Sequence, residues 1–144
     1  MTTSFTFINE SNMKRASFTL NTSAIHWLRL YAIHNILGLP REIDNETHKT
    51  VIAQFPNLCY HDDGEGYYVG ITRTDFNKEW PLNAQIWVGS VRGLYRELQR
   101  VNAHMLADNH QEGARDVLQE FFKAFQEIEY DPEENAQYVF IIFS

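Results

Sequence analysis

Residues 90–130 read SVRGLYRELQRVNAHMLADNHQEGARDVLQEFFKAFQEIEY, and this stretch decides the fold class. Ser90 can cap a helix, because apolar residues then recur every three or four positions as far as Met105. Asn109 and Glu112 have the spacing of a capping box, and a second periodic apolar series follows them. The short link between the two series predicts an antiparallel helical hairpin.

Strands are predicted on both sides of this hairpin. Residues 5–9 and 16–20 alternate apolar and polar side chains and are joined by the turn-like stretch NESN, which indicates two paired strands. Residues 136–143 are apolar on both faces, which indicates a central strand or one that pairs with another chain. Further short strands are predicted at residues 49–55, 58–62, 66–76 and 85–88.

A third helix is predicted between these strands. Ser23 is the expected N-cap, the helix runs to about Leu37, and Gly38 with Pro40 gives a stop signal. Residues 39–49 are polar and predict a loop. The order of elements predicts an α+β fold in which a mostly antiparallel sheet of five to six strands packs against three helices, with the C-terminal helical hairpin followed by a final central strand. The length of 144 residues predicts a single domain, 1–144.

Composition excludes several classes of protein. A chain with one cysteine forms no internal disulfide, which favours a reducing, cytoplasmic location. The N-terminal stretch is not a signal peptide by its pattern, and no apolar run approaches the roughly 20 residues of a membrane helix. We therefore expect no membrane association.

The charge is concentrated in one segment. The net charge is −7, and residues 108–134 alone hold nine acidic and two basic residues, so the rest of the chain is neutral. A protein that binds nucleic acid directly needs the opposite sign. A concentrated negative surface favours a basic protein partner through electrostatic steering.

Residues 60–68, YHDDGEGYY, follow the single cysteine and resemble a site for chemistry. On a strand, Cys59, His61 and Asp63 would share one face, as a nucleophile, a base and an orienting acid do. Side chains two apart on a strand are about 7 Å apart, too far for a direct Cys–His hydrogen bond. The spacing also fits no calcium loop or zinc motif. We expect a solvated hairpin tip there, and no catalytic residues, metal or cofactor.

The two predicted helices of residues 90–130 carry charges of opposite sign. Arg92, Arg96, Arg100 and His104 recur every four residues on the first helix. Acidic residues recur on the second helix, so Arg100 could pair with Asp116 and Arg96 with Glu120 across the seam. Alternatively, the stripes diverge, the acids face outward and the arginines bind an anion.

The sequence predicts a small acidic protein, not an enzyme, that binds and neutralises or inhibits a basic macromolecular partner such as a toxin or a nucleic-acid enzyme. Immunity proteins and protein inhibitors of enzymes are the types meant. Two alternatives stay open: a small cytoplasmic enzyme using Cys59, His61 and Asp63, and a homodimer or larger structural homo-oligomer assembled through the C-terminal strand, residues 138–144. The expected partner-binding residues are Asp62, Asp63, Glu65, Glu112, Asp116, Glu120, Glu127, Glu129, Glu133 and Glu134.

Overall fold

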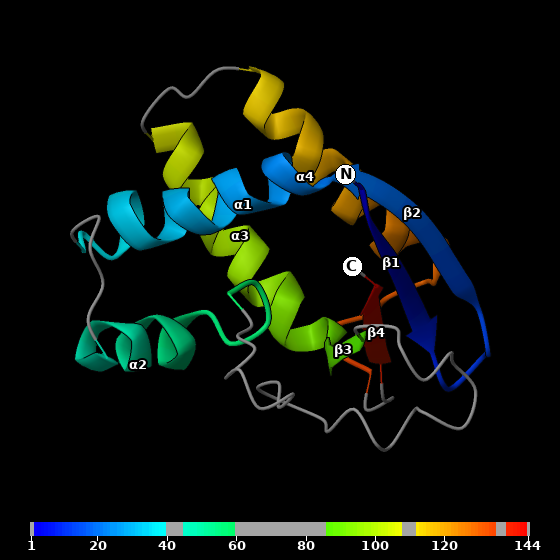
Figure 1. Cartoon of the computed structure of the whole chain (residues 1–144). Coiled ribbons are helices and arrows are strands. Elements are labelled where there is room, and N and C mark those ends of the chain that lie inside the picture. Colours follow the sequence, from blue (N-terminus) through cyan, green and yellow to red (C-terminus); the bar gives the residue numbers. More distant parts are fainter. Residues whose placement is uncertain (1, 40–44, 60–85, 108–111, 135–137, 144) are drawn as a thin grey trace.

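The computed structural model describes residues 2–39, 45–59, 86–107, 112–134 and 138–143 (Figure 1). Two strands at the N-terminus are followed by helices, and two further strands flank the last two helices. The elements are β1 (Thr2–Asn9), β2 (Arg15–Asn21), α1 (Thr22–Tyr31), a π-helical turn η1 (Ala32–Ile36), α2 (Asn45–Gln54), β3 (Ile86–Ser90), α3 (Val91–Ala107), α4 (Glu112–Glu127) and β4 (Tyr138–Phe143).

The strands form one antiparallel sheet in the order β2-β1-β4-β3. Phe7 of β1 lies opposite Ala16 of β2 on one side and Phe140 of β4 on the other. The last strand of the chain is therefore hydrogen-bonded within the chain on both of its edges. Among the described strands, the open edges of the sheet belong to β2 and β3.

The predicted five to six strands and three helices are wrong for the described residues, which form four strands and four α-helices. The main error is at residues 49–55, predicted as a strand, of which residues 49–54 lie in α2. Val51 and Phe55 are buried at i, i+4 spacing, and the Phe55 amide donates to the Val51 carbonyl at 2.8 Å. Burial at helical period overrides the strand preference of the β-branched residues. The predicted loop at 39–49 is wrong at its end, because α2 begins at Asn45.

The other predicted strands of the middle segment are only partly tested. Leu58 and Cys59 lie in a turn, in which the Cys59 amide donates to the Phe55 carbonyl at 2.9 Å, so the predicted strand at 58–62 does not begin there. The predicted strand at 66–76 lies outside the described residues. The predicted strand at 85–88 overlaps β3, Ile86–Ser90.

The first helix begins earlier than predicted. Asn21, not Ser23, is the N-cap: its Oδ1 accepts from the Ser23 amide at 3.0 Å and from the Ser23 hydroxyl at 2.8 Å. The helix passes into η1, and Gly38 follows with a φ of 67°, the left-handed conformation that favours glycine after a helix.

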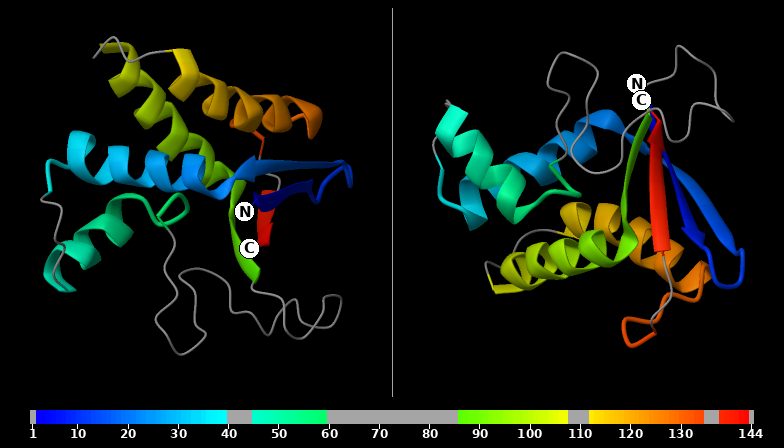
Figure 2. Two further views of the ribbon diagram at one scale, coloured as in Figure 1. Left: turned by 45° about the horizontal axis from the view of Figure 1, so that its top comes forward. Right: turned by 90° about the horizontal axis from the view of Figure 1, so that it is seen from below.

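The core lies between the sheet and the helices on one of its sides (Figure 2). Phenylalanine rings from β1, β2 and α4 meet there. The ring centroids of Phe5 and Phe121 are 5.1 Å apart, those of Phe18 and Phe121 5.4 Å, and those of Phe7 and Phe125 5.0 Å. Aromatic pairs at these separations stabilise packing beyond their buried area. They anchor one side of α4 on β1 and β2, so the other side faces outward.

A buried carboxylate joins the turn after α2 to α3. The Glu97 carboxylate accepts from the amides of Asn57 and Leu58, at 3.0 and 2.9 Å, and from the Asn57 side chain at 2.7 Å. The side-chain Oδ1 of Asn57 in turn accepts from the Ser90 amide at 3.0 Å. Gly93 permits this contact, because a Cβ there would lie 2.3 Å from Asn57 Nδ2. Burial raises the pKa of Glu97, although the hydrogen bonds from Leu58 and Asn57 oppose the rise.

Candidate partner-binding surface

Helix α4 separates apolar from acidic side chains. Leu118, Phe121 and Phe125 are buried at steps of three and four residues, and the two phenylalanine rings pack against rings of the sheet. Acidic side chains occupy the outward side and continue into the turn after the helix. We call the exposed acids of α4 and this turn the acidic surface; they are Asp116, Glu120, Glu127, Glu129, Asp131, Glu133 and Glu134.

Contacts with the N-terminal hairpin hold the turn in place. The buried Asn9 side chain donates to the Ile128 carbonyl at 2.9 Å. Lys14, at the end of the β1–β2 hairpin, forms an ion pair with Glu129, whose φ of 55° marks the sharp change of direction after the helix. Glu129 therefore has an internal partner.

Glu134 is also engaged within the chain. Its carboxylate accepts from the Tyr138 hydroxyl at 2.8 Å, and its carbonyl accepts from Arg92. In contrast, no hydrogen bond or ion pair is formed by the carboxylates of four acids within the described part of the chain. These four unpaired acids are Asp116, Glu120, Glu127 and Glu133.

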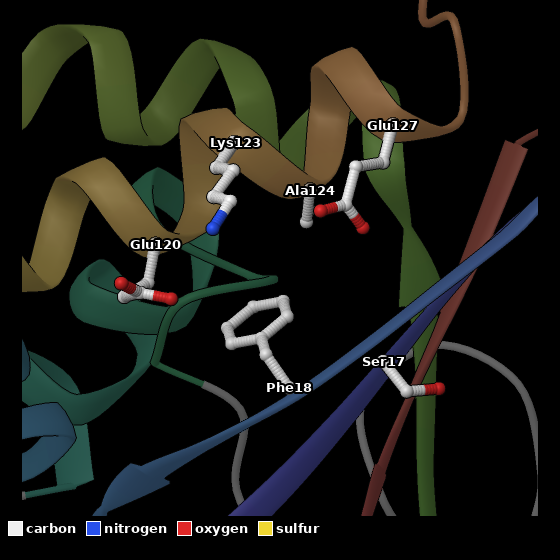
Figure 3. Close-up of a pocket in the computed structure, with 6 residues that line it drawn as sticks. All are labelled: Ser17, Phe18, Glu120, Lys123, Ala124 and Glu127. Carbon is white, nitrogen blue, oxygen red and sulfur yellow. The ribbon is translucent and has the colours of Figure 1, made fainter.

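Two of the unpaired acids border a hollow between α4 and β2 (Figure 3). It has a volume of about 170 Å³. Glu120 and Glu127 lie on either side of Lys123 along α4. The Phe18 ring points from β2 toward this helix. The lining residues are Ser17, Phe18, Glu120, Lys123, Ala124 and Glu127. The formal charges of Glu120, Lys123 and Glu127 sum to −1 at the hollow. No ion pair joins Lys123 to either glutamate in the described structure.

The basic stripe of α3 does not pair with α4 in the described residues. Arg100 donates to Gln54 Oε1 at 3.0 Å, and its guanidinium lies 5.0 Å from the centre of the Phe55 ring. The hydroxyl of Tyr31 and His104 Nδ1 are 2.7 Å apart. Arg92 contacts the turn after α4 as described above. The predicted pairs of Arg100 with Asp116 and of Arg96 with Glu120 are absent from the described structure, which leaves those two acids open to solvent.

Four of the expected partner-binding residues cannot be placed in this surface. Asp62, Asp63 and Glu65 lie outside the described residues, as do His61 and the rest of the predicted hairpin tip. Glu112 is the first residue of α4, and its side chain is likewise not described.

The thiol of Cys59 lies in the core. Burial raises the pKa of Cys59 to about 12, the nearby Arg29 guanidinium lowers it in part, and Glu97 raises it further. A thiol with so high a pKa has almost no thiolate at neutral pH, and the thiolate is the nucleophilic form. This environment is typical of a cysteine that packs as a small apolar residue.

No group of three or more His, Cys, Asp or Glu side chains that could hold a metal ion occurs in the described ranges. None of the helices described is long and apolar enough to cross a membrane. The chain finds no match among models of protein families, curated proteins or solved structures.

The acids of this surface were predicted from the sequence, but the hollow was not. The roles of Ser17, Phe18, Lys123 and Ala124 could not be predicted, because they depend on β2 lying at the edge of the sheet beside α4. The three-residue step from Glu120 to Lys123 and the inward position of Phe18 on its strand were the only features that pointed to this place.

Proposed function

We propose that the protein is a small acidic binding protein that neutralises or inhibits a basic macromolecular partner. One observation carries this proposal: the exposed carboxylates of Asp116, Glu120, Glu127 and Glu133 have no partner in the described structure. A set of uncompensated charges on one helix and its following turn raises the local concentration of a positively charged protein and speeds its association.

The chemistry of the surface favours a partner that itself binds a polyanion. Toxins that attack nucleic acids and other nucleic-acid enzymes present basic residues to phosphates. An acidic surface held rigidly on a packed helix could cover such residues, so inhibition would result from steric occlusion supported by complementary charge. Because the chain has a single, buried cysteine, we place this function in a reducing compartment, the cytoplasm.

Four amide substitutions test the proposal: Asp116→Asn with Glu120→Gln, Glu127→Gln and Glu133→Gln. The wild-type protein, immobilised, should retain a basic partner from an extract of its host, and the dissociation constant for that purified partner is then measured. We expect the quadruple variant to bind on the order of tenfold more weakly or worse, because each exposed charge contributes about 0–1 kcal/mol. If the partner is an enzyme, wild-type protein should also inhibit it.

The matched control removes acids outside the surface. Glu10 and Glu46 are exposed, and Glu10→Gln with Glu46→Gln should change the dissociation constant by less than about twofold. Circular dichroism should show that both variants keep the wild-type fold. Equal affinity of the wild-type protein and the quadruple variant would refute the proposed function.

A further inference from the structure

The free edge of β2 offers a second means of recognition next to the acidic surface. Among the described strands, β2 is paired only with β1, so one row of its backbone amides and carbonyls has no strand partner. Exposed edges are usually protected by charged residues or proline. Arg15 is the only charged residue of β2 and stands at its start, and Ala16–Asn21 contains neither charge nor proline.

The hollow lies at this edge. Its lining comes from β2 and α4 alone, with no residue of β1, so it is at the outer side of the sheet (Figure 3). Phe18 is partly buried there and supplies an apolar floor, and the carboxylates of Glu120 and Glu127 stand above it on α4.

We propose that the basic partner inserts an extended segment along the free edge of β2, as an added strand, and places lysine or arginine side chains in the hollow. This inference rests on the proposed function and specifies how the partner is bound. Backbone hydrogen bonds along an edge give affinity, and pockets for alternate side chains give specificity. Complementary charge selects a basic occupant, because two glutamates and one lysine line the hollow.

The spacing of the carboxylates fits alternate side chains of such a segment. Residues seven apart on a helix are about 10 Å apart along its axis, and alternate side chains of a strand are about 7 Å apart. Long basic side chains make up this difference. Their aliphatic stems can lie on the Phe18 ring while the charged ends reach the carboxylates. Lys123 lies between the two glutamates and opposes the same occupant.

A synthetic peptide tests the strand addition on the full chain. The probe is a blocked ten-residue peptide of alternating lysine and valine, and its control carries N-methyl groups on two consecutive central residues. Consecutive residues direct their amides to opposite edges, so the control loses a donor on each edge. At low ionic strength we expect saturable binding of the probe, slower amide exchange in residues 15–21 by NMR, and at least tenfold weaker binding of the control.

Substitutions that remove a negative or a positive charge at the hollow test whether the hollow selects a basic occupant. We expect Glu120→Gln and Glu127→Gln each to weaken binding of the probe about two- to fivefold, and Lys123→Gln to strengthen it by a similar factor. Asp116→Asn is the matched control, since Asp116 lies on α4 but not at the hollow, and it should change the affinity less. A general loss of folding could not produce an increase in one variant and decreases in two others.

Three results would overturn this inference: no saturable binding of the probe, equal affinity for the methylated control, or unchanged amide exchange in β2. Equal affinity for both peptides would mean that charge alone attracts them, and the proposed function would survive. Undiminished binding of the purified partner by the quadruple amide variant would remove the proposed function instead. The two ideas therefore fail on different measurements.

Discussion

At the scale of single residues, the buried carboxylate of Glu97 was not foreseeable from the sequence. It lies on a helix among Arg96, Gln99 and Arg100, which are exposed, and such a position is typical of a solvated charge. It is buried because the turn at Asn57 and Leu58 brings backbone amides that need an acceptor in the interior. That requirement arises only after the turn has packed on α3.

Glu97 should make stability depend on pH in a recognisable direction. Its pKa is raised by burial above the ordinary value of 4.5, so the folded state holds this proton more tightly than the unfolded state. The contribution of protonated Glu97 to stability is therefore fully present below pH 4.5 and is lost as the pH rises through the higher folded value. Relative to Glu97→Gln, wild-type stability should fall across that window.

Urea unfolding of both proteins, at a series of pH values from about 4 to 8, measures this difference. Glu97→Ala serves as a further check, because it leaves the amides of Asn57 and Leu58 without their acceptor. It should lower the free energy of unfolding by about 2–4 kcal/mol. A stability difference between wild type and Glu97→Gln that stays constant over the pH series would contradict the assigned cause of the pKa rise.

At the scale of elements, short-range sequence patterns predicted the helices and strands for which local sequence preference and tertiary packing favour the same conformation. β1 alternates Phe5 and Phe7 with polar residues, and α3 begins after Ser90, whose hydroxyl accepts from the Gly93 amide at 3.2 Å. α2 was missed because Thr50–Ile52 has β-branched side chains, while packing buries Val51 and Phe55 at helical spacing. The sheet order that creates the hollow is a long-range property and leaves no local pattern.

The start of α1 gives a prediction at this scale. Asn21→Ala removes the acceptor of the Ser23 amide and should destabilise the protein by about 1 kcal/mol, measured by thermal or urea unfolding. Ser23→Ala is the matched control, since Ser23 is exposed inside the first turn and alanine is the better helix former. It should cost less than Asn21→Ala. The reverse order would restore Ser23 as the cap.

At the scale of the whole molecule, the strand order constrains how the protein can associate. β4 is paired with β1 and β3, so assembly of copies through residues 138–143 would require native strand pairing to break. Among the described strands, β2 and β3 have free edges, and the acidic surface lies beside the edge of β2. The two lie next to each other because the phenylalanine cluster holds α4 against β1 and β2.

The sequence gives the net charge of the chain, but it does not show which acidic side chains are unpaired and exposed. Sequence alone left open whether the acids of α4 pair with the arginines of α3. The described contacts of Arg92 and Arg100 go elsewhere, to Glu134 and Gln54, and Asp116 and Glu120 stay unpaired. The acidic surface is thus a property of how the helices are placed, which short-range patterns do not determine.

The proposal that four unpaired acids attract a basic partner is tested most directly by the salt dependence of binding to that purified partner. The dissociation constants of the wild-type protein and of the variant with all four unpaired acids changed to amides are measured from about 0.05 to about 0.5 M salt, since screening weakens interactions between exposed charges. If the four acids attract the partner, the affinity of the wild-type protein falls steeply with salt, the affinity of the variant falls much less, and the two affinities converge at high salt. Parallel salt dependences for the two proteins would contradict this proposal.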